Sequence, residues 1–325
     1  MLRAMGKTLS KGLLVCLGAL LLAAAPAGAA QPVDMAAPYE YLGWGEPQPP
    51  ATVMAESGIK DLTMAFMLSH KKCNPEWDGE RPLLGGVDQS AIESIRAAGG
   101  DVDVSFGGWS GKKLGSSCKT VTALAGAYQK VIAAYSLKAI DIDIEHGEVR
   151  SKKVRQRVIE ALAAVQKEDP GIDISVTFGT AESGPESSGL SLIEDAAAIG
   201  FQPTGWTIMP FDFGPPKTDM GHASIHALEG LAADVSAAFH VSLAFAYEHS
   251  GASSMNGKTD ESSETVSAQN FKTLLEFAQQ KHLARLSFWS VNRDRPCGTS
   301  KGEDECSGIA QAPYEFTALL AGYHG

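Results

Sequence analysis

The segment Asp141-Ile142-Asp143-Ile144-Glu145 alternates acidic residues with isoleucines. Successive side chains of a β-strand point to opposite faces, so the three acids share one face and the two isoleucines share the other. The segment therefore predicts a strand that packs Ile142 and Ile144 outward against helices and directs three carboxyl groups inward.

Short apolar segments with few polar interruptions recur along the chain and alternate with amphipathic segments of helical period. The predicted strands are 39–44, 62–68, 102–106, 139–145, 172–178, 206–211, 241–246 and 285–290. The predicted helices are 53–56, 88–98, 121–135, 154–166, 190–198, 225–239, 271–280 and 314–320. Strict alternation implies a parallel sheet, and at this length we expect an α/β fold that closes into a (β/α)8 TIM barrel. The polar stretch 250–264 is expected to be a loop after the seventh strand.

The first residues have the features of a secretory signal peptide. Arg3, Lys7 and Lys11 precede an uncharged apolar run over 12–25, and small residues over 27–30 resemble a cleavage site. The run is shorter than the roughly 20 apolar residues of a membrane span. A lipoprotein anchor at Cys16 is the rival interpretation, although Val15 stands where such anchors want a small residue. We expect 1–30 to be removed, and 31–325 to form one secreted barrel domain.

Charge and cysteine content limit the partners and the compartment. The net charge of −11 disfavours nucleic acid and anionic membranes as partners, and favours a neutral or cationic one. Four cysteines remain after the predicted signal segment, an even number that favours two disulfides in an exported chain. The sequence leaves their pairing open, and no CxxC pair supports a zinc site; the four are Cys73, Cys118, Cys297 and Cys306.

The three acids of the fourth strand call for a chemical explanation. An acidic face is ordinary on a strand with one side in water, but expensive on a strand covered on both sides. Neighbouring carboxyl groups cannot all ionise, so at least one pKa should rise, as a general acid at neutral pH requires. A metal-binding carboxylate cluster is less favoured, because no His or Asn stands beside the acids at ligand spacing. Catalysis is the favoured interpretation.

Four motifs at predicted strand ends together resemble glycoside hydrolase family 18. The acidic strand is similar to the family signature Asp-x-x-Asp-x-Asp-x-Glu, and Ser105-Phe106-Gly107-Gly108 resembles its Ser-x-Gly-Gly motif. Met209-Pro210-Phe211-Asp212-Phe213-Gly214 lies where the family has Met and then Asp beside Tyr, and the segment 288–297 resembles bacterial chitinases. The motifs follow one another in family order, which is more specific than any one of them.

The resemblance implies a role for each matching residue. Glu145 would protonate the glycosidic oxygen, while the 2-acetamido oxygen of the substrate attacks the anomeric carbon. Asp143 would orient and stabilise that acetamido group. Asp141 would lie behind Asp143 and share a proton with it. Asp212 would help to hold the acetamido group, and Trp289 would form an apolar floor under the sugar. The other residues implied in substrate binding are Met209, Phe211, Phe213, Ser105, Gly107 and Gly108. No cofactor and no metal is implied.

Three departures from the family pattern concern activity. The first Asp of the signature is Lys138 here, which would either neutralise Asp141 or point outward and pair with a carboxylate. Phe211 and Phe213 stand where the family usually places a Tyr hydroxyl, and the loss of such a donor costs about 10²–10³ in rate. His146 follows the acid where many relatives have Gly. We therefore expect reduced or specialised activity in preference to complete loss.

Three functions are consistent with the sequence. The first is a monomeric chitinase acting on β-1,4-linked N-acetylglucosamine polymers or oligosaccharides. The second is a carbohydrate-binding or inhibitor protein on the same barrel with little or no activity, which the retained Glu145 argues against and Phe211, Phe213 and Lys138 favour. The third is an endo-β-N-acetylglucosaminidase, which the resemblance of the eighth strand end to bacterial chitinases makes less favoured.

Overall fold

The computed structural model describes residues 1, 35–214, 219–261, 263–298 and 304–324. The chain divides after Gln31, and the fold below is that of the second unit, Pro32–Gly325. The expected signal segment therefore lies outside the described residues, apart from Met1. Among the described residues, no helix has both the length and the apolar character that a membrane span requires.

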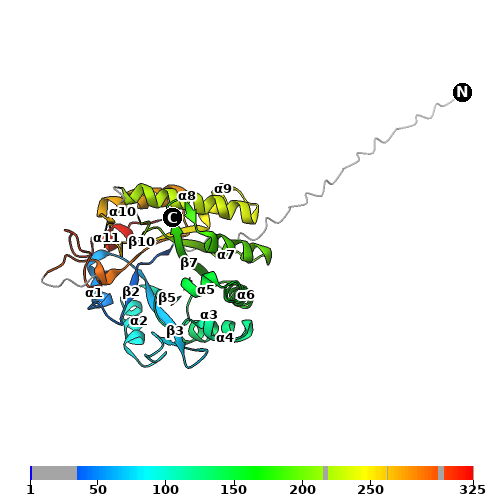
Figure 1. Cartoon of the computed structure of the whole chain (residues 1–325), viewed down its shortest axis with the longest axis horizontal. Coiled ribbons are helices and arrows are strands. Elements are labelled where there is room, and N and C mark those ends of the chain that lie inside the picture. The colour runs from blue at the N-terminus through cyan, green and yellow to red at the C-terminus, as the bar shows by residue number, and fades with distance from the viewer. Residues whose placement is uncertain (2–34, 215–218, 262, 299–303, 325) are drawn as a thin grey trace. The chain divides into compact units, whose positions relative to one another are not determined.

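The second unit is a nearly closed barrel of eight parallel strands inside a ring of helices, so the predicted fold class is confirmed (Figure 1). The first strand is broken into β1 (Met35–Ala36), which pairs with β13, and β2 (Tyr39–Tyr41), which pairs with β3. The other seven, in chain order, are β3 (Asp61–His70), β5 (Asp101–Gly107), β6 (Ala139–Asp143), β7 (Asp173–Ala181), β9 (Gly205–Met209), β10 (Ser250–Met255) and β13 (Arg285–Trp289).

The broken first strand closes the barrel. The Ala37 carbonyl, in the break between β1 and β2, accepts hydrogen bonds from the Thr63 hydroxyl on β3 at 2.9 Å and from the Ser287 hydroxyl on β13 at 2.7 Å. These two bonds connect strands that are distant in the sequence, and they bring the two ends of the sheet together.

The helices follow the predicted order. The main ones are α1 (Pro50–Ser57), α2 (Val87–Ala97), α4 (Val121–Tyr135), α6 (Lys152–Glu168), α7 (Ser187–Ala198), α8 (Met220–Phe239), α10 (Ala268–Lys281) and α11 (Glu315–Leu320). Short helices are α3 (Leu114–Ser117), α5 (His146–Arg150), α9 (Leu243–Glu248) and the 3-10 turn η1 (Val291–Arg293). Short strands outside the barrel are β4 (Asn74–Trp77), β8 (Gly184–Pro185), β11 (Gly257–Lys258) and β12 (Thr265–Val266).

The prediction of the seventh strand was wrong. Most of 241–246 belongs to α9, where the Ser242 hydroxyl accepts from the Phe245 amide at 3.2 Å and caps the helix. The strand is β10, which lies in the stretch expected to be a loop. Its small residues escaped the hydrophobic pattern, yet the barrel needs them: a Cβ on Gly251 would lie 2.8 Å from Thr207 Oγ1 and 2.9 Å from the Arg285 carbonyl oxygen.

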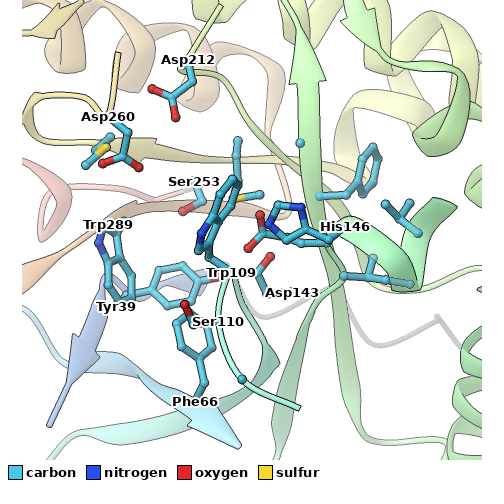
Figure 2. Close-up of a pocket in the computed structure, with 18 of the residues that line it drawn as sticks. Tyr39, Phe66, Trp109, Ser110, Asp143, His146, Asp212, Ser253, Asp260 and Trp289 are labelled. Atoms are coloured by element: carbon cyan, nitrogen blue, oxygen red, sulfur yellow. The ribbon is translucent and has the colours of Figure 1, made fainter. Parts of the chain in front are cut away.

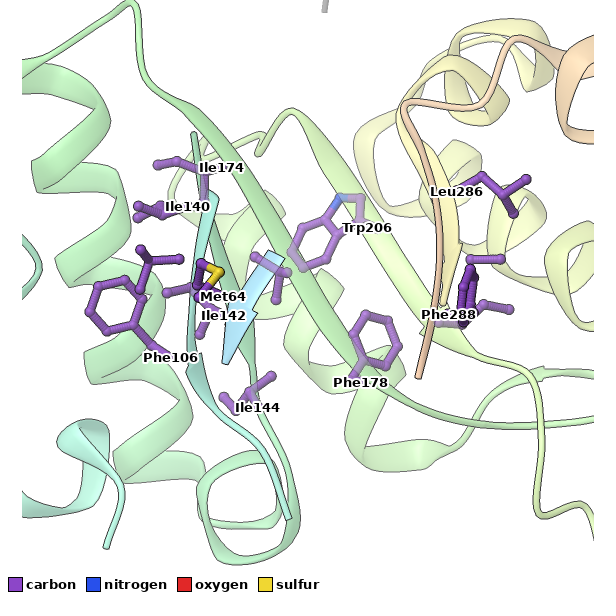
Figure 3. Close-up of a cluster of buried hydrophobic side chains, with 14 of the residues drawn as sticks. Met64, Phe106, Ile140, Ile142, Ile144, Ile174, Phe178, Trp206, Leu286 and Phe288 are labelled. Atoms are coloured by element: carbon purple, nitrogen blue, oxygen red, sulfur yellow. The ribbon is translucent and has the colours of Figure 1, made fainter. Parts of the chain in front are cut away.

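The core lies between the strands and the helices. Ile142 and Ile144 point outward into this layer and are buried, as the alternation in the sequence predicts (Figure 3). They share it with residues from other strands, including Phe106, Phe178, Trp206 and Phe288. The lumen, in contrast, holds polar side chains that bond across strands, such as the Ser175 and Thr207 hydroxyls 2.8 Å apart. The outer layer supplies the apolar burial, which leaves the lumen available for charged groups.

Candidate active site

A cleft of about 1070 Å³ opens at the carboxyl ends of the strands, where barrels of this type carry their active sites. Figure 2 shows side chains that converge on it from different parts of the chain, including Tyr39 from β2, Asp143 from β6 and Trp289 from β13. Asp143 and Glu145 line the cleft, whereas Asp141 is fully buried beneath it. The predicted acids are therefore together, but at different depths.

The strand and the acids differ in one respect from the sequence prediction. β6 ends at Asp143, and Glu145 takes the N-cap position of α5 instead of a place on the strand. Asp141 and Asp143 are thus fixed by sheet pairing to β5 and β7, whereas Glu145 is carried past the sheet to the cleft wall. This arrangement puts the deeper carboxyls in the lumen and the last one where a ligand can reach it.

Asp141 is held by three hydroxyl groups. Its Oδ2 accepts from the Tyr39 hydroxyl at 2.7 Å and the Ser105 hydroxyl at 2.6 Å, and its Oδ1 accepts from the Thr177 hydroxyl at 2.6 Å. Four strands therefore meet at one carboxyl group. Ser105 is fully buried and does not line the cleft, so the structure assigns it to supporting Asp141 instead of contacting substrate as predicted.

Asp143 and Glu145 have raised pKa values, and for Asp143 the neighbouring acids contribute as the clustering predicts. Burial, together with the charges of Glu145 and Asp141, raises the pKa of Asp143 well above its usual value. Asp143 Oδ1 is buried without a hydrogen-bond partner. Burial is the largest cause that raises the pKa of Glu145; with the lowering effect of the Lys113 charge and the raising effects of Asp260 and Asp212, this pKa is about 7. A carboxyl with this pKa can hold a proton near neutral pH and also release it.

Lys113 is a buried cation that the sequence analysis missed. Its Nζ donates to the carbonyl oxygen of Gly107 at 3.2 Å and to those of Gly108 and Ser110. Its charge lowers the pKa values of Asp143 and Glu145. Lys113 lies outside every predicted strand and motif, so no sequence pattern marks it.

Gly107 and Gly108 have no side chains to offer a ligand, and their role is steric. Gly107 has a φ of 116°, and a Cβ there would lie 2.0 Å from the Asp143 carbonyl oxygen. Gly108 has a φ of 79°, and a Cβ there would lie 2.8 Å from the Phe66 ring. The pair lets β5 approach both the acidic strand and the aromatic floor, which only glycine permits. Neither residue lines the cleft, which corrects their predicted place among the substrate-binding residues.

Lys138 does not reach the acids. Its side chain is 81% exposed, and its Nζ pairs with Asp101 at 2.9 Å on the outside of the barrel. Lys138 precedes Asp141 by three positions, an odd number that puts it on the opposite face of the strand. The expectation of an outward side chain with a carboxylate partner is confirmed, and neutralisation of Asp141 by Lys138 is excluded.

The end of β9 contributes one wall of the cleft. Met209, Phe211 and Asp212 line it, whereas Phe213 does not, and both Phe residues pack against the core. Two backbone amides, those of Asp212 and Phe213, donate to the Glu264 carboxylate at 2.7 Å each. Asp212 lies near Asp260 at the upper edge of the cleft (Figure 2). Of the two Phe residues, the structure therefore brings only Phe211 to the cleft.

Aromatic rings form the floor. Trp289 stacks on Phe66 with a centroid distance of 5.5 Å and an interplanar angle of 15°, and Tyr39 and Tyr41 lie beside it. The flat faces suit the CH face of a sugar ring. Trp289, the residue predicted to form the floor, therefore lies at the cleft. Phe66 on β3 also forms the floor, but the sequence marks it only as part of a predicted strand.

A second aromatic group stands at the rim next to the acid. Trp109 is 71% exposed, lines the cleft, and meets the His146 ring edge-on at 3.9 Å between centroids. His146 adopts a φ of 48°, a conformation that glycine takes at no steric cost. The replacement of Gly by His thus places an imidazole against Trp109.

A further prediction concerns the four cysteines. Both disulfides are formed, Cys73–Cys118 with a Cα–Cα distance of 4.7 Å and Cys297–Cys306 with 5.1 Å. Among the residues that the structure describes, no group of three or more His, Cys, Asp or Glu side chains is arranged to hold a metal ion.

Known proteins with similar sequences and structures are glycoside hydrolases. The chain is 27% identical over 290 residues to a probable bifunctional chitinase/lysozyme of Escherichia coli, covering 83% of this chain and 32% of that protein. It is 27% identical over 252 residues to endochitinase 11 of Metarhizium anisopliae, covering 73% of this chain and 48% of that protein. The chain thus spans less than half the length of these curated relatives, and no protein-family model matches it.

Among solved structures, the catalytic domain of the hyperthermophilic chitinase from Pyrococcus furiosus superposes with a TM-score of 0.80 at 26% identity, covering 88% of this chain and 93% of that domain. Catalytic-site mutants of the same domain have been solved with chito-oligosaccharides. A fungal endo-β-N-acetylglucosaminidase of family 18 has a TM-score of 0.57 at 13% identity, a likeness of fold alone.

Proposed function

We propose that this chain, a glycoside hydrolase family 18 chitinase-like protein, is a chitinase that hydrolyses β-1,4-linked N-acetylglucosamine chains with retention of configuration. The observation that carries the proposal is the pair of carboxyl groups at the cleft. Glu145 lines the cleft with a pKa of about 7, and Asp143 also lines it and has a buried, unpartnered oxygen.

In the first step, the Glu145 carboxyl donates its proton to the glycosidic oxygen as the bond from that oxygen to the anomeric carbon breaks. The 2-acetamido oxygen of the same sugar forms a bond to that carbon, which gives a cyclic oxazolinium ion. Asp143 holds the acetamido N–H and balances the developing positive charge. The unpartnered Oδ1 of Asp143 is available for this contact.

In the second step, the Glu145 carboxylate takes a proton from a water molecule that attacks the anomeric carbon. The carbon–oxygen bond to the acetamido group breaks, and the sugar leaves with its original configuration. Protonation of Glu145 by that water restores the starting state. The stacked Trp289 and Phe66 rings would carry the sugar at the cleft floor.

The test is turnover of a fluorogenic chitotrioside and of chitohexaose by the purified protein. We expect hydrolysis with retention, observed by proton NMR of the fresh products. Glu145→Gln should lower kcat by at least about 10³-fold and leave oligosaccharide binding intact. Glu160→Gln, the same change on the exposed face of α6, is the matched control.

Binding without turnover by the wild-type protein would contradict the proposal and favour a carbohydrate-binding barrel. Release of high-mannose glycan from a glycopeptide, without cleavage of chitohexaose, would instead favour an endo-β-N-acetylglucosaminidase. Either result is distinct from misfolding, which a thermal melt detects.

We also propose that the chain is an exported monomer. The signal-like segment over 1–30 and the two disulfides support export, because disulfides persist in oxidising compartments. Expression of the full chain in a secreting host should yield a product that begins after Ala29 or Ala30, as mass spectrometry of the intact protein would measure. An uncleaved chain retained in the cell would contradict export, and a dimer mass by light scattering would contradict the monomer.

A further inference from the structure

Arg285 lies at the first position of β13 and points into the barrel beneath the acids. Its side chain is 1% exposed, and its Nη1 lies 2.9 Å from Asp103 Oδ2 and 3.7 Å from Asp141 Oδ1. Its Nη2 donates to the Thr63 hydroxyl at 2.8 Å, and the guanidinium lies 5.4 Å from the centre of the Tyr39 ring. The side chain is therefore fixed by groups on four other strands.

The charges around Arg285 do not balance. Asp103 and Asp141 are both buried, with side chains 2% and 0% exposed, and one guanidinium lies between them. Within the part of the chain that the structure describes, Arg285 is the only cation in an ion pair with Asp141. Lys138, the basic residue nearest in sequence, is on the outside of the barrel. Isolated buried carboxylates are costly, so this contact decides which groups can be charged in the lumen.

Although Asp103 lies closer to the guanidinium than Asp141 does, its surroundings favour an ionised carboxylate less. Its Oδ1 is buried without a hydrogen-bond partner, and burial raises its pKa to about 6. Asp141, in contrast, accepts three hydroxyl hydrogen bonds, an arrangement that suits an ionised carboxylate. A negative charge on Asp141 in turn raises the pKa of Asp143, and this effect is larger than the direct lowering by the Arg285 charge.

We propose that Arg285 is a positioning residue for the acid pair: it holds Asp141 as a carboxylate beneath Asp143, so that the proton of the buried pair resides on Asp143. Arg285 does not line the cleft and acts through Asp141. The effect on turnover rests on the proposed function, whereas the charge state of Asp141 can be measured without any turnover.

The other groups that face this site are accounted for by strand. Tyr39 on β2 and Thr177 on β7 donate to Asp141, Thr63 on β3 accepts from Arg285, and Lys113 acts on Asp143 from the loop after β5. The described residues of β9 and β10 face the lumen with uncharged side chains such as Thr207 and Ser253. Removal of the guanidinium charge therefore leaves Asp141 with hydroxyl donors alone.

The experiment compares the wild type with the double variant Arg285→Met/Asp103→Asn, which removes the cation without leaving Asp103 as an unpaired buried anion. Removal of an opposite charge at this distance shifts an ionisation by about one pH unit or more. We expect the acid limb of the kcat/KM profile to move upward by about that amount, with KM within about twofold. Asp103→Asn alone leaves the guanidinium to Asp141, so its acid limb should stay at or below the wild-type position.

A readout that needs no turnover is the carboxyl carbon resonance of Asp141, assigned by its loss in Asp141→Asn. At pH 6 we expect a carboxylate shift in the wild type and a move toward the carboxylic-acid shift in the double variant. Arg285→Lys, which keeps the charge, should retain the wild-type shift. If the double variant does not fold, Arg285→Gln/Asp103→Asn keeps a hydrogen-bonding group at this position and replaces it.

A uniform loss of activity with an unmoved profile and an unmoved resonance would overturn the proposal and leave Arg285 a packing role. If the wild type shows no turnover but the resonance moves as expected, the proposed function fails and the role of Arg285 stands. If turnover occurs and the resonance does not move, the proposed function stands and the proposed role of Arg285 fails.

Discussion

The Tyr39 hydroxyl donates a 2.7 Å hydrogen bond to Asp141 Oδ2, although 102 positions separate the two residues in the chain. The bond joins the first barrel strand to the fourth across the lumen. It is one of the three hydroxyl hydrogen bonds that Asp141 accepts. Because Tyr39 lies on the first strand, this donor is in place only when the barrel is closed.

Tyr39→Phe should lower kcat by about tenfold, because loss of one donor to a buried carboxylate costs about 1–2 kcal/mol. The same change should move the acid limb of the pH profile upward, since Asp141 then accepts a proton more easily. The pH dependence of kcat/KM on a fluorogenic chitotrioside measures both. A loss of rate that is equal at all pH values, together with a lowered melting temperature, would indicate that Tyr39 acts only in packing.

Activity should fall as the pH rises through about 7, because Glu145 must be protonated to act and its pKa is about 7. Above that point, kcat/KM should decline about tenfold per pH unit. The negative charge of Asp260 raises the pKa of Glu145, so Asp260→Asn should move this basic limb to lower pH. A basic limb that moves upward in Asp260→Asn would contradict the electrostatic assignment.

Phe211→Tyr should raise kcat by about tenfold or more, since it would place a hydroxyl on the cleft wall where enzymes of glycoside hydrolase family 18 usually have one. Phe213→Tyr is the matched control, because Phe213 packs against the core as Phe211 does but does not line the cleft. Both variants are measured on the same chitotrioside. Equal rates for Phe211→Tyr and the wild type would show that the missing hydroxyl does not limit this protein.

Glu40 should make the fold less stable at alkaline pH. Both of its carboxyl oxygens are buried without a hydrogen-bond partner, and burial raises its pKa from 4.5 to about 8. A raised pKa in the folded state means that the contribution to stability is fully present below about pH 4.5 and is lost as the pH rises through 8, on the order of 5 kcal/mol in all.

Urea melts from pH 4 to pH 9 measure this dependence. The free energy of unfolding of Glu40→Gln should vary less with pH than that of the wild type, whereas Glu56→Gln on the exposed face of α1 should keep the wild-type dependence. Parallel curves for Glu40→Gln and the wild type would show that Glu40 does not titrate in this range.

Removal of the Cys73–Cys118 disulfide should cost more stability than removal of Cys297–Cys306, because the closed loops span 45 and 9 positions. The chain-entropy model gives about 4 and about 2.6 kcal/mol for loops of these lengths. Denaturant melts of the two Cys→Ser pairs measure the difference. A larger cost for the shorter loop would indicate that packing around Cys297 and Cys306 outweighs loop entropy.

The barrel strands with a strong apolar pattern were predicted correctly, whereas β10, which lacks such a pattern, was not. Residues 241–246 looked like a strand because they are apolar, whereas β10 consists of Ser, Gly and Ala up to Met255. The selection of small side chains in β10 depends on Thr207 and Arg285 on the neighbouring strands, as the close approach at Gly251 shows. The local sequence pattern does not show which residues will lie next to the strand in the folded barrel.

The alternation in Asp141-Ile142-Asp143-Ile144-Glu145 by itself determined a strand with buried isoleucines and clustered acids, since the two faces of a strand follow from its period of two. Only the tertiary structure decided which groups surround those acids. Lys138, three positions before Asp141 in sequence, points to solvent, whereas Arg285, 144 positions after it, supplies the buried cation that pairs with Asp141. Strand pairing sets these distances, and the energy of a buried charge depends on distance in space and not on separation in the chain.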